Sequence, residues 1–142
     1  MEAVYVDHMG DDLRVAYIAG LIDADGCVAI NKVDEGRYAP CLSFVNTSLD
    51  LVYLIQDRFG GNIQQKKKVS KNHADVFELQ IRDSKELAHA LHILIPFLRY
   101  KKKKAELAKE YVWSIMDNKK KKLSVETKET RKEILHRWRL LT

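Results

Sequence analysis

The sequence has few cysteines and no long hydrophobic segment, and both absences restrict what the protein can be. Only Cys27 and Cys41 occur among 142 residues. Two cysteines cannot build a disulfide-stapled scaffold, and their spacing is unlike a zinc site, so we expect both to be reduced. No apolar run approaches the roughly 18 residues of a membrane-spanning helix. The first residues lack the basic and apolar regions of a signal peptide, so we expect an intracellular protein.

Charge is distributed unevenly along the chain. Residues 1–60 contain 4 Lys or Arg and 10 Asp or Glu, whereas residues 61–142 contain 21 and 10. The overall net charge of +5 therefore combines −6 in the first part with +11 in the second. A basic surface concentrated in one part of a domain favours a polyanionic partner. A lysine-rich exterior that is merely solvated is the alternative, and charge alone does not separate the two.

Hydrophobic periodicity and turn signals predict an α+β protein with the element order αββαββα, followed by one or two further helices. We expect a single domain over residues 1–142, with an N-terminal arm at 1–11 and a basic linker and C-terminal helix at 118–142. The predicted helices cover about 12–25, 48–59, 84–95 and 98–116, with a last one after Ser124. The predicted strands cover about 27–33, 39–46, 62–69 and 75–82. Four antiparallel strands with helices on one face would leave the other face in solvent.

The outward positions of these strands are rich in amide and basic side chains. Such groups can read base edges or contact phosphates, so a DNA-binding sheet is predicted. A solvated sheet face would also be polar and is the plainer alternative. The expected DNA-contacting residues are Ala29, Asn31, Ser43, Gln64, Lys66, Lys68, Glu78, Gln80 and Arg82.

The segment from Ile18 to Gly26 has an unusual combination of small and acidic residues. Leu13, Tyr17 and Leu21 share a helical spacing, and we expect them to form an apolar side. Small residues on another side would allow a second helix to approach closely. The segment then ends in two acids and Gly26, which we expect to stop the helix in the left-handed conformation.

The two acids of this segment, Asp23 and Asp25, cannot have the same role. They are two residues apart on a helix and point to nearly opposite sides. Carboxylates are unfavourable at the negative end of a helix dipole, but with unpaired carbonyl oxygens they can bind a hard cation such as Mg²⁺ or Ca²⁺. Asp25, at the very end, is the expected metal ligand, and Asp23 is expected to accept hydrogen bonds from nearby backbone amides.

Residues 18–26, Ile-Ala-Gly-Leu-Ile-Asp-Ala-Asp-Gly, resemble the signature of the LAGLIDADG homing endonucleases at every position except the first. The predicted elements extend the resemblance over about residues 12–116. It implies a site-specific endonuclease of intron or intein origin that binds double-stranded DNA on a saddle-shaped sheet. It also implies a staggered double-strand cut in a long, near-palindromic target.

The resemblance implies a metal-assisted mechanism for phosphodiester hydrolysis. Asp25 and the backbone carbonyl of Ala24 would hold Mg²⁺, and Ca²⁺ is expected to support binding without cleavage. By analogy, Lys101 follows the Pro-Phe-Leu segment as a residue that stabilises charge, and Asn46 or Thr47, with Asn46 preferred, occupies the polar position after the second strand.

One motif in one chain supplies one set of metal ligands, whereas cutting two strands needs two. A homodimer in which the motif helices pack together would provide both sets, and single-motif members of the family are homodimers. The expected interface residues are Ala16, Ala19, Gly20 and Asp23. Three other functions are the alternatives: an RNA-splicing maturase with intron RNA as partner, a non-cleaving DNA-binding protein, and a module that pairs its helix with another protein.

Overall fold

The computed structural model describes residues 10–66, 74–117 and 124–141. Within these residues the elements follow the predicted order αββαββα, and one 3-10 turn and two further helices come after it. Those in the first half are α2 (Asp11–Asp25), β1 (Gly26–Asp34), β2 (Arg37–Asn46), α3 (Leu49–Phe59) and β3 (Asn62–Lys66). Those in the second half are β4 (Val76–Ile81), α4 (Ser84–Leu94), η1 (Ile95–Phe97), α5 (Lys102–Asp117) and α6 (Val125–Leu141).

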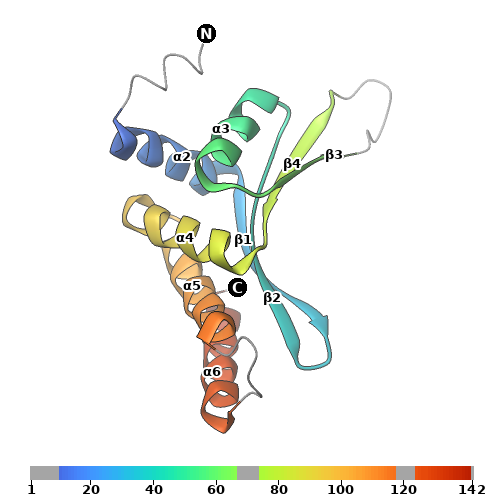
Figure 1. Cartoon of the computed structure of the whole chain (residues 1–142), viewed down its shortest axis with the longest axis vertical. Coiled ribbons are helices and arrows are strands. Elements are labelled where there is room, and N and C mark those ends of the chain that lie inside the picture. Colours follow the sequence, from blue (N-terminus) through green and yellow to red (C-terminus); the bar gives the residue numbers. More distant parts are fainter. Residues whose placement is uncertain (1–9, 67–73, 118–123, 142) are drawn as a thin grey trace.

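The strands form one antiparallel sheet in the order β1-β2-β4-β3. Figure 1 shows the helices gathered on one side of this sheet and the other side uncovered. The predicted α+β architecture is therefore confirmed. Residues 1–9 of the arm predicted at 1–11, the end of the third strand beyond Lys66 and residues 118–123 of the basic linker lie outside the described residues.

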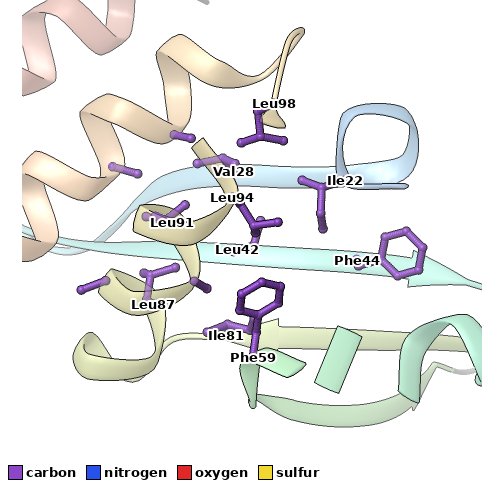
Figure 2. Packing of buried hydrophobic residues seen from close by; sticks show 14 of the residues in the cluster. Ile22, Val28, Leu42, Phe44, Phe59, Ile81, Leu87, Leu91, Leu94 and Leu98 are labelled. Carbon is purple, nitrogen blue, oxygen red and sulfur yellow. The ribbon is translucent and has the colours of Figure 1, made fainter. Parts of the chain in front are cut away.

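The core lies between the sheet and the helices, where alternate strand residues meet the apolar helix faces. Figure 2 shows Ile22 of α2 and the leucines of α4 facing side chains of β1, β2 and β4. Because side chains alternate along a strand, the residues between these buried positions point to the uncovered face. The strand and α3 contributors include Val28, Ile30, Leu42, Phe44, Phe59, Leu79 and Ile81.

Polar side chains start three of the helices as their positions predict. Ser48 accepts a hydrogen bond from the amide of Leu51, and Asp83 accepts one from the amide of Glu86. Ser124 does the same before α6. These caps satisfy amides that have no partner within the helix. At the other end of α3, Gly60 has a φ of 86°, so a glycine stops the helix.

Helix α2 starts without a side-chain cap, although two acids, Asp11 and Asp12, lie in its first turn. Its N-cap is Gly10, and no side chain caps the helix. Asp11 lies in the first turn and accepts two hydrogen bonds from Arg58 of α3, at 2.9 and 3.1 Å. The hydrogen bonds from Arg58 hold the pKa of Asp11 below its ordinary value. The acid therefore links two helices instead of capping one.

The apolar side that was expected of α2 is not the side that packs against the sheet. Leu13 is 63% exposed and Tyr17 is 44% exposed, so neither belongs to the core. The buried side instead consists of Val15, Ile18, Ala19 and Ile22. Helical spacing pointed to the series of Leu13 and Tyr17, but spacing alone does not identify which side of a helix packs against the chain's own sheet.

Gly26 does not adopt the left-handed conformation that was expected. Its φ is −82° and its ψ is 171°, so the backbone is extended and leads directly into β1. A Cβ on Gly26 would lie 2.8 Å from the carbonyl oxygen of Ile22 and 2.9 Å from its Cα. Glycine is therefore needed here because the backbone passes close to the preceding turn of α2.

Helix α6 packs along α5 and completes the described part of the chain. Its residue Ile134 is 1% exposed and belongs to the core cluster. Arg131 donates to the hydroxyl and carbonyl of Ser114, and Arg137 donates to Glu110. Among the described residues, no helix has the length and apolar character that crossing a membrane requires.

Candidate functional site

The C-terminal end of α2 contacts the turn between η1 and α5. The carboxylate of Asp23 accepts hydrogen bonds from the backbone amides of Arg99 at 2.9 Å and Lys101 at 3.0 Å. These amides lie at the start of α5, where an anion is favourable. This agrees with the expected hydrogen bonding of Asp23 to nearby amides. It also corrects the predicted start of the last core helix, because residues 98–101 form the turn that Asp23 holds and α5 begins at Lys102.

The side chain of Lys101 also contacts the C-terminal end of α2. Its Nζ donates to the backbone carbonyl oxygen of Asp23 at 2.7 Å. Lys104 instead lies over the ring of Trp138, 5.7 Å from its centroid, while Lys102 and Lys103 are exposed. Of the four successive lysines, Lys101 is therefore the one that contacts the end of α2.

The pKa of Asp23 reflects two opposing effects. Partial burial alone would raise it, but the backbone amides of Arg99, Lys101 and Tyr100, together with the Lys101 ammonium, outweigh burial and hold the pKa below its ordinary value. Asp23 is therefore an ionised, hydrogen-bonded group at neutral pH.

Asp25 lies two residues further along and is exposed. It is the last residue of α2, and Gly26 begins β1 directly after it. Ala24, whose carbonyl is the other predicted metal ligand, is exposed as well. Asp25 thus has a solvent-accessible carboxylate at a helix end whose negative dipole favours a cation.

Asn46 ends β2 at the same edge of the sheet. Gly26, which follows Asp25, pairs with Phe44 of β2. Asn46 lies two residues further along β2, near the end of α2. Its Oδ1 accepts a hydrogen bond from the amide of Ser48 at 2.8 Å. Thr47, the alternative to Asn46, is exposed beyond the end of the strand.

These oxygen donors have the chemistry that a hard cation requires. Mg²⁺ is usually held by one or two carboxylates together with water and substrate phosphates. The described residues contain no cluster of three or more His, Cys, Asp or Glu side chains that could hold a metal. The exposed carboxylate of Asp25 and the backbone carbonyl oxygens of the helix end are oxygen donors of this kind.

The strand register shows that several of the predicted DNA-contacting residues share the uncovered face of the sheet. Direct register partners lie on the same face, and Ser43 pairs with Gln80, which pairs in turn with Asn62. Gln64 pairs with Glu78 in the next row. Asn62 was missed by the sequence reasoning, although its position two residues before Gln64 already places it on this face.

The remaining predicted contact residues have the following positions. Ala29 and Asn31 alternate with the buried residues of β1, so they point outward, and Lys66 does the same on β3. Arg82 follows β4 and is exposed, with its guanidinium against the Cys41 thiol. Burial raises the pKa of that thiol despite the nearby arginine. Lys68 lies outside the described residues.

The four predicted interface residues of α2 are divided by the structure. Gly20 is exposed and Ala16 is partly exposed. Ala19, in contrast, is 0% exposed within this chain's own core, so the prediction that it contacts a second copy is wrong. Asp23 is partly exposed, with its carboxylate occupied by the turn before α5.

Comparison with solved structures finds the same fold in homing endonucleases. I-CvuI, solved with its target in the presence of calcium, has 22% identity and a TM-score of 0.63 over 87% of this chain and 96% of that chain. The archaeal intron-encoded I-Vdi141I, solved with DNA, has 18% identity and a TM-score of 0.64 over 92% and 99%. The meganuclease I-AabMI, bound to uncleaved DNA, has 22% identity and a TM-score of 0.65 over 84% and 43%.

Comparisons with sequences add the family. No curated protein matches the chain. The family model described as a LAGLIDADG-like domain matches residues 12–94, which is more than half of the chain and includes the whole motif at residues 18–26. With this match, the motif at residues 18–26 and the shared fold, the chain belongs to the LAGLIDADG family.

Proposed function

We propose that this chain is a homing endonuclease that cuts both strands of a long, near-palindromic DNA site by Mg²⁺-assisted phosphodiester hydrolysis, acting as a homodimer. The observation that carries this proposal is the end of α2. There an exposed carboxylate, Asp25, lies two residues from the carbonyl that the Lys101 ammonium contacts at 2.7 Å. The similar homing endonucleases that were solved with DNA support the choice of substrate.

The roles of the residues follow from their positions. Asp25, with the Ala24 carbonyl, would hold the metal, and Lys101 would stabilise negative charge that develops on the phosphate. When bound, Mg²⁺ supplies activation of a water and stabilisation of the leaving oxygen. Asn46, at the same edge of the sheet, would orient water through its remaining amide group. Asp23 holds Lys101 in place through the backbone and has no part in the chemistry.

Three features of α2 support a homodimer. The exposed side combines Leu13 and Tyr17 with the small residues Ala16 and Gly20. A Cβ on Gly20 would meet nothing within 4 Å inside this chain. Glycine within a helix costs roughly 0.5–1 kcal/mol relative to alanine, and no close packing within this chain requires a glycine at this position. A second helix close to Gly20 would explain both the glycine and the exposed apolar groups.

The uncovered sheet face supports DNA as the ligand. Its row of Ser43, Gln80 and Asn62 has hydroxyl and amide groups side by side across three strands, and the amide of Gln64 lies in the next row. Such groups can form hydrogen bonds with base edges in the major groove. Exposed Lys66 and Arg82 would contribute contacts to phosphates or guanine.

The test is cleavage of a plasmid that carries the host gene without the intervening sequence. We expect linear product with Mg²⁺, and binding without cutting with Ca²⁺. Ends mapped by sequencing should be staggered. Splicing of the intron RNA by the protein, in the absence of any DNA cleavage, would instead identify a maturase. Failure to bind the duplex under all of these conditions would contradict the proposal.

A further inference from the structure

Three side chains on the uncovered sheet face form a connected group. Gln80 donates from Nε2 to Oε1 of Glu78 at 3.0 Å. Lys66 Nζ lies 3.9 Å from Oε2 of the same carboxylate. Glu78 and Gln80 are two residues apart on β4 and so share a face, while Lys66 extends from the neighbouring strand β3. The two carboxylate oxygens therefore have partners on two strands.

Glu78 is less accessible than its partner in the ion pair. Its side chain is 16% exposed, whereas that of Lys66 is 51% exposed. A carboxylate that lies low on the sheet and has both oxygens engaged cannot extend to a base without losing these contacts. The contacts therefore favour a residue that acts through its neighbours over one that reads cytosine directly.

The contact with Glu78 determines how Gln80 can present its amide. An ionised carboxylate only accepts hydrogen bonds, so the amino group of Gln80, and not its carbonyl, must face Glu78. A glutamine without such a partner can rotate its amide and exchange donor and acceptor. Held by Glu78, Gln80 keeps one N–H and its Oε1 available, which are the donor and acceptor with which glutamine pairs with adenine.

Lys66 offsets the charge of Glu78 on a surface that would meet phosphates. A lone carboxylate there would repel DNA, and the nearby ammonium reduces that repulsion. The same contact draws the ammonium toward the sheet and away from a phosphate. Glu78 thus weakens the non-specific attraction of this surface to DNA, and it gives the Gln80 amide a defined orientation.

We propose that Glu78 is a positioning residue for base selection: it fixes the Gln80 amide to select an A·T pair and restrains Lys66, and it does not itself contact a base. This inference rests on the proposed function, since it requires that the sheet face binds duplex DNA. The ligand class is double-stranded DNA with an adenine opposite Gln80 in the major groove.

The test is selection of bound duplexes from a randomised DNA pool in the presence of Ca²⁺, followed by sequencing. Wild type, Gln80→Ala, Glu78→Ala and the double variant are compared on the same pool. Gln80→Ala should remove a preference of about 10-fold for adenine at one position. Glu78→Ala should reduce the preference at that same position to about 3-fold, and the double variant should match Gln80→Ala because the two residues act as a unit.

Glu78→Gln separates the two contacts of the carboxylate. Its carbonyl can still accept the hydrogen bond from Gln80, but it has no charge to attract Lys66. We expect Glu78→Gln to retain most of the adenine preference that Glu78→Ala loses. Both variants should show a steeper salt dependence, by about 0.9 in the slope of log affinity against log salt for one added phosphate contact. A purely structural role would not move these two readouts separately.

Two results would overturn the inference, and they are distinguishable. If Glu78→Ala alters a base position that Gln80→Ala leaves unchanged, or if the effects of the two variants add, Glu78 reads a base itself while DNA binding stands. If the wild type selects no sequence, the proposed function fails and the inference fails with it. Thermal unfolding of every variant controls for folding, and if Glu78→Ala does not fold, the comparison of Glu78→Gln with Gln80→Ala decides the question.

Discussion

Asp23 and Asp25 are separated by one alanine, yet their surroundings give them different properties. The Asp23 carboxylate accepts hydrogen bonds from the amides of Arg99 and Lys101. The Lys101 ammonium in turn donates a hydrogen bond to the carbonyl oxygen of Asp23. These three contacts hold the end of α2 against the start of α5. Asp25 is exposed at the junction with β1. One acid therefore stabilises the local structure, and the other is accessible for chemistry.

The lowered pKa of Asp23 determines how its contribution depends on pH. A carboxyl whose folded pKa is below its unfolded value of about 3.9 binds its proton more weakly in the folded state. Its stabilising contribution is fully present above the unfolded pKa. That contribution is lost as the pH falls through the folded pKa.

Asp23→Asn should therefore destabilise the fold at pH 7 by about 1 kcal/mol, because it weakens two hydrogen bonds between a charged group and backbone amides. Because protonation of wild-type Asp23 removes the same charge, the difference between the two proteins should narrow as the pH falls below about 4. Urea denaturation at a series of pH values measures this. Asp57→Asn, an exposed acid on α3, is the matched control. An equal deficit of Asp23→Asn at every pH would show that ionisation is not the cause.

At the scale of elements, local patterns predicted which segments are helices or strands, while their contacts depended on distant parts of the chain. The caps at Ser48, Asp83 and Ser124 are local, because each side chain accepts a hydrogen bond from an amide three residues further along the chain. The turn at residues 98–101, between η1 and α5, was not predictable, because its amides bind Asp23, which is more than 70 residues away in the chain. The same holds for position 26, where glycine is required because the backbone approaches Ile22 closely.

Helix α2 illustrates the same limit for its faces. The series that contains Leu13 and Tyr17 has helical spacing, as does the series that contains Ile18 and Ile22. Only the three-dimensional structure distinguishes the side that packs on the sheet from the side left exposed. The candidate active-site residues were predicted from the resemblance to the family, because no spacing rule relates Asp25 to Lys101 or Asn46.

Gly20→Leu should weaken a dimer formed by the exposed side of α2. A leucine side chain would keep two helices apart that otherwise approach closely at a glycine, so the dissociation constant should rise at least about tenfold, which corresponds to about 1.4 kcal/mol. Sedimentation equilibrium measures the constant. Glu106→Leu, at an exposed position of α5, controls for added hydrophobicity. A wild-type protein that is monomeric at all concentrations tested would contradict the homodimer.

At the scale of the whole molecule, one core connects the first helix with the last. Val15 of α2 and Ile134 of α6 belong to the same buried cluster, although α6 itself packs mainly on α5. The ion pair between Arg137 and Glu110 and the contacts of Arg131 with Ser114 reinforce this packing. Helix α6 should therefore contribute to the stability of the core and not behave as a detached segment.

Ile134→Ala is expected to lower the free energy of unfolding by about 2–4 kcal/mol, because it removes buried methyl groups and leaves a cavity. Leu140→Ala, on the same helix but at a side chain that is 73% exposed, should change it by less than about 0.5 kcal/mol. Chemical denaturation of both variants gives the comparison. Equal effects of the two substitutions would contradict the docking of α6 on the core.

The role of Asp25 is tested most directly by the rate at which Asp25→Asn cuts its target DNA at saturating protein concentration with Mg²⁺. Binding to the same duplex in Ca²⁺ is measured in parallel. Loss of a charge that acts in the transition state should slow cutting by at least about 100-fold, with DNA binding retained because the sheet face is unchanged. Cutting by Asp25→Asn at the wild-type rate would contradict the assignment of the metal site to the end of α2.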